Sequence, residues 1–261
     1  MNKRKIIVIG SICAYLIIVA CALYFNIIPY AVEVKAQNKA DEAAKEMLAL
    51  VAQPQPEIVS VPQDQPEEKT FTVNSRYTEI LEKYPDVVGK VTIDETNIDY
   101  LVVQAQDNDY YLHRDYDGNE SKSGAIFMDY TSEAKKLKEE LNGNIVMYGH
   151  NMKSGSMFHN LRYYKDDEYF KEHNIIVFET LNEEIKWEVF SVYVDSGNCI
   201  GNDTEFYDEE GYDEFLRELK ERSLVETDIL LSDTKCILSL VTCDYSVDDG
   251  RLFVHAKMID E

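Results

Sequence analysis

The chain has 261 residues, of which 45% are hydrophobic, and a formal net charge of -23 at pH 7. This composition suits one globular domain with appendages. The acidic excess argues against a nucleic-acid-binding surface, which needs Lys and Arg to contact phosphates, and against a broad electrostatic attraction to anionic lipid.

The N-terminal segment predicts a membrane anchor. Residues 1–5 include Lys3, Arg4 and Lys5, and the uncharged residues 6–28 would form a helix about 35 Å long, enough to span a bilayer. Cations before the helix predict a cytoplasmic N-terminus and an exported remainder. The competing interpretation is a cleaved signal peptide, with residues 20–22 or the lipobox-like residues 18–21 as the cleavage site. Apolar residues continue past Cys21 to Ile28, which favours a retained helix.

A stalk and linker are predicted over residues 29–70. Residues 31–52 are rich in Ala, Glu, Lys and Leu and predict a helix, whereas residues 54–66 contain four of the six prolines. The folded domain is therefore expected over residues 71–261. It shows no internal repeat.

Within this domain, eight short runs have the apolar or alternating pattern of strands. They are residues 87–93, 98–103, 125–128, 144–148, 175–180, 184–195, 236–242 and 252–259. Short strands with helices between them predict a closed barrel. The predicted fold class is mainly β with helices: a barrel of about eight strands behind a single N-terminal transmembrane helix.

Five helices are predicted, one before the first strand and four between strands. They cover residues 75–84, 131–141, 157–163, 166–172 and 208–223. The first is an N-terminal helical region that Pro85 ends, and the last is inserted before the strand that leads to Cys243. In this last helix Tyr212, Phe215, Leu216 and Leu219 form one apolar face, so we expect a surface helix packed on the barrel.

The last two predicted strands place a thiol beside a permanent cation. A short loop joins the strand that ends at Cys243 to the strand that begins at Arg251, which predicts an antiparallel hairpin with these residues adjacent. A neighbouring cation favours the thiolate, the form of cysteine that attacks electrophiles.

The five cysteines predict at least one free thiol. Cys13 and Cys21 lie in the apolar segment, so an odd number remains in the exported part. Cys236 and Cys243 would be about 23 Å apart along one extended strand and cannot pair, whereas a bridge from Cys199 to Cys236 stays open. No CxxC pair or His/Cys cluster has zinc-site spacing, and no metal site is predicted.

His150 is the predicted proton-transfer partner of the thiol. It follows a strand that looks buried, at residues 144–148, and Gly149 before it permits an unusual backbone turn. The other histidines have ordinary explanations: His113, His159 and His173 have polar or helical surroundings typical of a surface, and His255 in mid-strand is expected to be structural.

The sequence around these residues resembles the class B sortases. The motifs that carry the resemblance occur in family order: Tyr148-Gly149-His150-Asn151-Met152, Leu240-Val241-Thr242-Cys243-Asp244-Tyr245, Gly250-Arg251-Leu252 with Val254-His255-Ala256, and upstream residues 98–104, 107–108, 111–112 and 124–130. They cover essentially the whole folded domain. The inserted helix and the N-terminal anchor also fit the family's pattern.

The resemblance implies a cysteine transpeptidase of the Gram-positive cell membrane, single-pass with an extracellular catalytic domain. Such an enzyme cuts the C-terminal sorting signal of a secreted protein after its threonine, at a Thr-Gly or Thr-Asn bond. It joins the threonine to an amine of peptidoglycan or of its lipid-linked precursor. The implied partners are therefore sorting-motif proteins and this amine, with the membrane reached through the N-terminal helix and without nucleic acid. No metal or organic cofactor is implied.

Residue by residue, the resemblance makes Cys243 the nucleophile, His150 the general acid and base, and Arg251 the group that positions substrate and stabilises the oxyanion. Asn108, Leu112 and Tyr148 match positions that line the family's peptide groove, and Thr242, which precedes the nucleophile, is expected to bind substrate by donating through its hydroxyl. Core packing is the alternative for Tyr148 and Leu112, and capping of a turn is the alternative for Asn108. An exposed cysteine ordinarily has a pKa near 8.5 and a histidine one near 6.5, so we expect a small thiolate–imidazolium population and a bell-shaped rate profile.

One position departs from the family pattern. Val241 stands where class B members commonly carry serine, which removes a potential hydrogen bond to substrate. Residues 197–206 resemble the family's specificity loop by position alone.

Four alternatives stay open. A thiol hydrolase or protease would release the product to water, and a sortase that polymerises pilins would use a protein amine. A noncatalytic surface protein would bury Cys243. A calcium loop at residues 115–119 lacks the glutamate expected at loop position 12, so a turn is favoured there.

Overall fold

The computed structural model describes residues 73–132, 143–196, 200–204, 206 and 208–259, together with Tyr24, Lys35, Lys45, Leu48 and Ala49. The chain divides into two compact units, Met1–Ala43 and Ala44–Glu261, and every element named below belongs to the second. No helix among the described residues is long and apolar enough to cross a membrane. The predicted anchor at residues 6–28, apart from Tyr24, lies outside these residues, as does most of the predicted stalk and linker.

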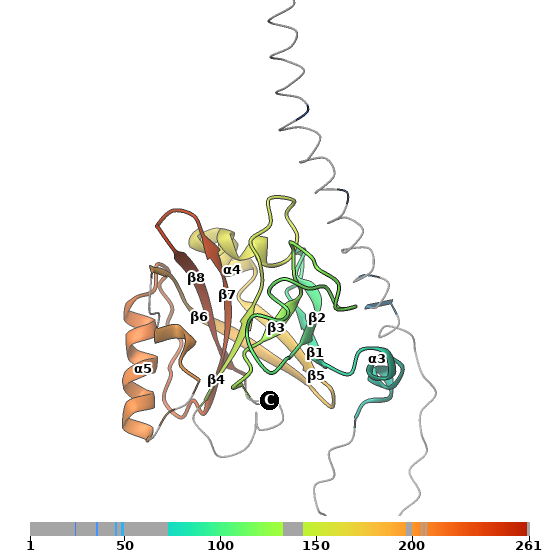
Figure 1. Ribbon diagram of the computed structural model, residues 1–261. Helices are drawn as coiled ribbons and strands as arrows, with labels where there is room; N and C mark the ends of the chain where they lie inside the picture. Colours follow the sequence, from blue (N-terminus) through green and yellow to red (C-terminus); the bar gives the residue numbers. More distant parts are fainter. Residues whose placement is uncertain are drawn as a thin grey trace, which may run out of the picture. The chain divides into compact units, whose positions relative to one another are not determined.

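Eight strands close into a barrel, which confirms the predicted architecture (Figure 1). The strands are β1 Val87–Thr92, β2 Asp99–Val103, β3 Ile126–Met128, β4 Gly143–Tyr148, β5 Ile175–Thr180, β6 Glu184–Ser196, β7 Cys236–Asp244 and β8 Gly250–Met258. Around the barrel their order is β1-β2-β3-β4-β7-β8-β6-β5. The pairs β2–β3 and β4–β7 are parallel, and the other pairs, including the predicted hairpin β7–β8, are antiparallel.

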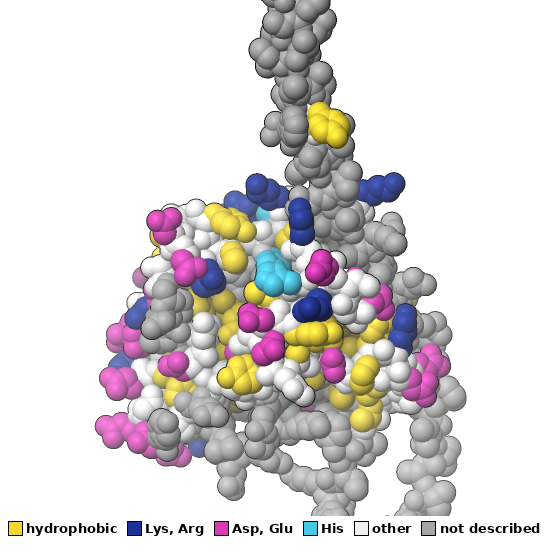
Figure 2. Space-filling model, in the orientation of Figure 1, with side chains coloured by type: hydrophobic (Ala, Val, Ile, Leu, Met, Phe, Trp, Pro, Cys, Tyr) yellow, Lys and Arg dark blue, Asp and Glu magenta, His cyan; other side chains and the backbone are white. Residues whose placement is uncertain are grey.

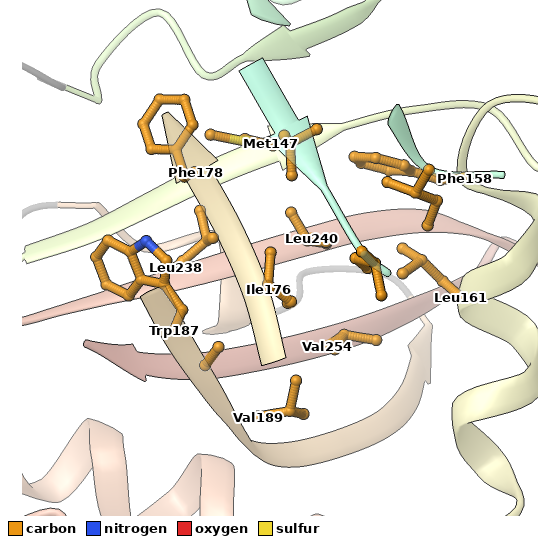
Figure 3. Close-up of a cluster of buried hydrophobic side chains, with 14 of the residues drawn as sticks. Met147, Phe158, Leu161, Ile176, Phe178, Trp187, Val189, Leu238, Leu240 and Val254 are labelled. Carbon is orange, nitrogen blue, oxygen red and sulfur yellow. The ribbon is translucent and has the colours of Figure 1, made fainter. Parts of the chain in front are cut away.

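The barrel interior is filled by side chains that alternate along the strands. On β7, Leu238 and Leu240 belong to the interior cluster, whereas Ile237 and Val241 belong to a second cluster on the outer side. Figure 3 shows the interior cluster, in which Trp187 and Phe178 lie on one side and Leu161 and Phe158 on another. Burying each large apolar side chain contributes about 1.5–3 kcal/mol.

Six short helical elements are described around the barrel: η2 Ser75–Tyr77, α3 Thr78–Lys83, η4 Phe158–Lys165, α4 Asp167–Glu172, η5 Ile200–Asn202 and α5 Glu209–Glu221. They match four of the five predicted helices to within a few residues. The segment at η4 is a 3₁₀-helix, and its buried residues Phe158, Leu161 and Tyr164 recur every three positions. The predicted helix at residues 131–141 lies outside the described residues except for Thr131 and Ser132, which are not helical.

Helix α5 packs on the outside of the barrel, as its apolar face predicts (Figure 1). Asp208 caps its N-terminus by accepting a hydrogen bond from Gly211 N at 2.8 Å. The buried face is the predicted set of Tyr212, Phe215, Leu216 and Leu219. These side chains pack against outward-facing residues of β4, β6, β7 and β8.

Candidate active site

The ends of β7 and β8 bring Cys243 and Arg251 directly opposite each other. Successive residues of a strand point to opposite faces. Since Leu240 and Val254 face the interior, and Val241 and Phe253 face outward, Cys243 and Arg251 share the outer face by parity. The sequence prediction that this hairpin makes them neighbours is confirmed.

Strand β4 brings His150 to the same place. Tyr148 pairs with Val241 in a parallel register, and Gly149 N donates to Val241 O at 3.1 Å. His150 is two residues beyond Tyr148, just as Cys243 is two residues beyond Val241. The register therefore carries His150, Cys243 and Arg251 to one end of three adjacent strands.

Two side chains tie the turn that carries His150 to the strand that carries Cys243. Thr242 Oγ1 donates to Gly149 O at 2.7 Å, and Asn151 Nδ2 donates to Cys243 O at 3.0 Å. The backbone of His150 is also held, because its carbonyl accepts from Phe158 N at 3.0 Å. We call the Thr242 and Asn151 bonds the strand–turn clamp.

Gly149 serves this turn for a different reason from the one expected. The φ angle of Gly149 is not positive, so this glycine does not supply an unusual backbone conformation. Instead, a Cβ at this position would lie 2.4 Å from Ile126 Cδ1 and 2.7 Å from Phe158 Cδ2. The glycine is required because the turn passes close to the core.

The imidazole of His150 is oriented by a backbone carbonyl. Its Nε2 lies 2.8 Å from Leu112 O. Because a carbonyl oxygen only accepts hydrogen bonds, Nε2 carries a hydrogen, and Nδ1 is the nitrogen left for proton exchange. The sequence named Leu112 as a side chain that contacts peptide, and it gave no signal for this use of its carbonyl.

The two described cysteines of β7 have different environments. Both are free, but Cys236 is buried in the interior cluster whereas Cys243 is half-buried. Burial raises the pKa of the Cys236 thiol to about 12, so it stays protonated and unreactive at neutral pH. Cys243 is therefore the accessible thiol of the two.

Comparison with known proteins agrees with this geometry. The sortase domain model of protein families matches residues 91–259. The chain belongs to the sortase family. Sortase B of Listeria monocytogenes is 35% identical over 176 residues, which are 67% of this chain and 70% of that protein. Sortase B of Staphylococcus aureus is 33% identical over 184 residues, which are 69% and 74% of the two chains.

Solved structures place the chain in class B of this family of cysteine transpeptidases. A crystal structure of Bacillus anthracis sortase B has a TM-score of 0.72 and 34% identity, and the match covers 87% of this chain and 99% of that one. A complex of S. aureus sortase B with its substrate has a TM-score of 0.70 and 25% identity, and the match covers 87% and 97%. The suspected class is thus confirmed.

In this sortase the guanidinium of Arg251 is held by the loop between β7 and β8. Its Nη1 donates to Asp249 O and to Gly250 O, both at 3.1 Å, and lies 2.9 Å from Asp249 Oδ1. The hydrogen bonds and ion pairs that Arg251 forms with described residues all use Nη1. Its Nη2 and Nε hydrogens therefore stay available to a ligand.

Asp244 fixes the start of the same loop. Its buried carboxylate accepts from Lys165 Nζ of η4 at 2.6 Å, from Ser246 N at 2.9 Å and from the Ser246 hydroxyl. Burial alone would raise the pKa of Asp244, but the bonds from Lys165 and Ser246 outweigh it and lower the pKa below its usual value. The sequence did not identify this ion pair, because Lys165 is 79 residues away.

Tyr245, which follows Asp244, belongs to the motif that carries the family resemblance, but the sequence analysis gave it no role. It is 76% exposed, yet partial burial of its hydroxyl raises its pKa. The charge of Cys243 raises this pKa further and that of Arg251 lowers it, so the phenol lies within electrostatic reach of both. Its position two residues after the cysteine was the available signal.

The predicted substrate-binding residues differ in their surroundings. Asn108 and Tyr148 are half-buried, and each donates to Asp129 Oδ2, at 2.7 Å and 3.0 Å. Thr242 is buried and its hydroxyl hydrogen already serves Gly149, which differs from the expected donation to substrate. Val241, the departure from the family pattern, is buried beside α5.

The exposed surface is chemically mixed. Figure 2 shows histidine on the displayed face among hydrophobic side chains and charged side chains of both signs. At residues 115–119, Asp115 Oδ1 accepts from Asp117 N and Asn119 N, which confirms the predicted turn. No group of three or more His, Cys, Asp or Glu among the described residues could hold a metal ion.

Proposed function

We propose that this chain cleaves a threonine peptide bond in the sorting signal of a secreted protein and transfers the threonine to a cell-wall amine. Cys243 acts as nucleophile, His150 as general acid and base, and Arg251 as the oxyanion-binding group. One observation carries the proposal: Cys243 faces Arg251 across β7 and β8, and the strand–turn clamp holds the His150 turn on β7.

The first half-reaction forms a thioester. The Cys243 thiolate attacks the threonine carbonyl carbon, so that a C–S bond forms and the carbonyl oxygen becomes negative. Collapse of this tetrahedral intermediate breaks the C–N bond, and His150 Nδ1 gives its proton to the departing amine. The products are the acylated Cys243, a neutral imidazole and the released C-terminal peptide.

The second half-reaction restores the enzyme. The acceptor amine attacks the thioester carbon, and its proton passes to His150. The C–S bond then breaks and returns its electron pair to Cys243 as thiolate. Neither half-reaction changes an oxidation state, so the chemistry requires only proton transfer and charge stabilisation.

Arg251 is suited to the oxyanion because its Nη2 and Nε hydrogens are not engaged by described residues. A guanidinium stabilises a developing negative charge through charge-assisted hydrogen bonds. Removing one such donor typically costs about 10²–10³ in kcat. Asp249 keeps the guanidinium in the loop while no substrate is bound, because it pairs with Nη1.

The sequence and the family support a proposed location and proposed partners. Residues 6–28 anchor the chain in the membrane, and the catalytic domain lies outside the cell, where secreted proteins and peptidoglycan precursors meet it. The substrate bond is Thr-Gly or Thr-Asn. Asn108, Leu112 and Tyr148 contribute to the peptide-binding region, and Thr242 supports it from the cysteine strand.

The test separates transfer from hydrolysis. The full chain in detergent is incubated with threonine-containing peptides, with and without hydroxylamine or triglycine, a peptide that one sortase B structure contains. We expect a hydroxamate or an amide at the threonine, each absent in Cys243→Ala. Free carboxylic acid alone, whatever amine is supplied, would favour the hydrolase. No cleavage of any peptide would contradict the proposal.

A further inference from the structure

Asp129 carries a buried carboxylate at the end of β3, and its residue is only 5% exposed. Oδ1 accepts from Thr131 N at 2.9 Å and from Thr131 Oγ1 at 2.6 Å. Oδ2 accepts from Asn108 Nδ2 at 2.7 Å and from Tyr148 OH at 3.0 Å. An ionised carboxylate is only an acceptor and has about four such sites, so these donors occupy it fully.

The two donors on Oδ2 are fixed in orientation. Asn108 Oδ1 accepts from Tyr130 N at 3.1 Å, so a flip of the amide would lose this bond as well as the one to Asp129. The ring of Tyr148 lies against Phe127, with ring centroids 5.2 Å apart. Hydrogen bonds to a buried charge are stronger than neutral ones, so Asp129 determines where both side chains lie.

The donor on Oδ1 leads to another part of the chain. Thr131 Oγ1 lies 2.6 Å from Thr204 Oγ1, and since the Thr131 hydrogen goes to Asp129, Thr204 donates. Thr204 belongs to the described part of the segment between β6 and α5. That segment is anchored independently, because Asn144 Nδ2 donates to Gly201 O at 2.9 Å and to Asp203 O at 3.0 Å.

We propose that Asp129 is a positioning residue that sets the substrate-binding arrangement of Asn108 and Tyr148 and couples it, through Thr131, to the segment at Thr204. This inference rests on the proposed function. Its consequence is that the loop between β6 and α5 influences peptide recognition through a hydrogen-bonded bridge, in addition to any contact of its own with the peptide.

The chemistry of the bridge makes an amide a poor replacement for the carboxylate. In Asp129→Asn, the new NH2 group would face either Asn108 and Tyr148 or the two donors of Thr131. The Tyr148 and Thr131 hydroxyls can accept from this NH2, but in the first orientation Asn108 Nδ2 and in the second Thr131 N loses its acceptor, and an unpaired buried donor is costly. The reactive pair Cys243 and His150 has no hydrogen bond to Asp129 among the described residues, so the intrinsic reactivity of the thiol should not change.

The sharpest test uses Thr131, where one substitution removes the hydroxyl and the other retains it. Thr131→Val keeps the branched shape and the backbone N–H but loses the bridge, whereas Thr131→Ser keeps the hydroxyl. With a threonine peptide that acylates the wild type, we expect KM to rise about tenfold in Thr131→Val, since the hydrogen bonds of the hydroxyl with Asp129 and with Thr204 are both lost. The kcat should stay within about twofold, and Thr131→Ser should match the wild type.

Asp129→Asn should raise KM further, and the same order should appear in peptide Kd values measured by fluorescence anisotropy in a Cys243→Ala background. Glu179→Gln is the matched control. Glu179 is another buried carboxylate and lies on β5, where its Oε1 is 2.6 Å from Arg76 Nη2. This substitution should leave KM unchanged. Alkylation of Cys243 by iodoacetamide, measured against pH, should be equal in all variants that retain Cys243.

The outcomes separate the two proposals. A wild-type KM in Thr131→Val and Asp129→Asn, with the wild type active, would overturn the positioning role alone. The positioning role would also be overturned if kcat or the rate of Cys243 alkylation fell by the same factor by which KM rose. Such a result would indicate a general structural defect. If no threonine peptide acylates the wild type, the proposed function fails and this inference fails with it.

Discussion

The buried part of the β7–β8 hairpin and its end at Cys243 make opposite uses of a cysteine and a histidine. At the start of β7 Cys236 points into the barrel core, and in the middle of the hairpin His255 is fully buried among Tyr193 and Phe253. At the end of β7 Cys243 is half-buried opposite Arg251, and His150 lies on the turn tied to it. The presence of a cysteine and a histidine on neighbouring strands is therefore not enough to make a reactive site. The cysteine needs access to solvent and a neighbouring positive charge, and the histidine needs a fixed tautomer.

The buried histidine, His255, is kept neutral by its surroundings on the outer side of the barrel. Asn144 Nδ2 is used by two carbonyls, so its Oδ1 accepts the Ser239 hydroxyl at 2.6 Å. Ser239 Oγ must then accept from His255 Nδ1, also at 2.6 Å. The other ring nitrogen, Nε2, is buried without a hydrogen-bond partner among the described residues. Burial lowers the pKa of His255 to about 3.

The largest expected effect separates the two cysteines. Cys243→Ala should reduce threonine-peptide cleavage by at least about 10⁴-fold, because no other group replaces the nucleophile. Cys236→Ala removes a small buried side chain and should leave kcat/KM within about threefold, with a loss of stability of about 1–2 kcal/mol. Cleavage assays and urea unfolding of both variants check this. Strong activity in Cys243→Ala would contradict the claim that Cys243, and not Cys236, is the nucleophile.

The next effect separates the two histidines. His150→Gln should reduce kcat by about 10³-fold, which is within the range for loss of a general acid and base, and should abolish the bell-shaped pH profile. His255→Gln should retain most activity per folded molecule. Steady-state rates between pH 5 and 10 provide the measurement. A wild-type rate that keeps rising well above pH 9 would contradict the acid role of His150.

The barrel and the pairing of Cys243 with Arg251 were predictable from the sequence for physical reasons, whereas the roles given to these residues and to His150 rest on the family resemblance. Apolar or alternating runs predicted where the strands lie. The short loop between Cys243 and Arg251 predicted that the last two strands pair as an antiparallel hairpin. The contacts of Asp129, Lys165 and Asn151 were not predictable. They join segments 19 to 92 residues apart, and their polar side chains look like any others on the surface until the barrel closes.

A third prediction concerns the free energy of unfolding at acid pH, which His255 should lower. Between about pH 6.5 and pH 3, the unfolded chain binds a proton at His255 that the folded chain does not, so this group lowers stability as the pH falls. From pH 7 to pH 5 the loss should be about 2 kcal/mol. Urea unfolding at both pH values should show a smaller loss in His255→Gln than in the wild type. Equal losses would mean that His255 charges freely in the folded state.

The smallest effect concerns the strand–turn clamp. Asn151→Ala and Thr242→Val each lose one hydrogen bond between the His150 turn and β7, and we expect about tenfold lower kcat/KM, carried mainly by kcat. Thr242→Ser should retain activity. Asn97→Ala, which removes a similar amide-to-carbonyl bond to Gly155 on the surface, is the control and should behave as the wild type.

The clamp prediction also resolves the role of Thr242. If its hydroxyl served substrate directly, as its position before the nucleophile leads one to expect, Thr242→Val would act mainly on KM. If it holds the turn, as its bond to Gly149 O indicates, the effect falls on kcat and on the pH optimum. Kinetics of the Val and Ser variants across pH distinguish these roles.

The most direct test of the central claim is the covalent intermediate itself. The full chain is mixed with a threonine-containing sorting peptide, quenched in acid to preserve thioesters, digested, and analysed by mass spectrometry. We predict that the segment with Cys243 gains the N-terminal part of the peptide, ending in threonine, and that hydroxylamine removes it. An adduct on another residue, or continued turnover with no adduct on Cys243, would contradict the account.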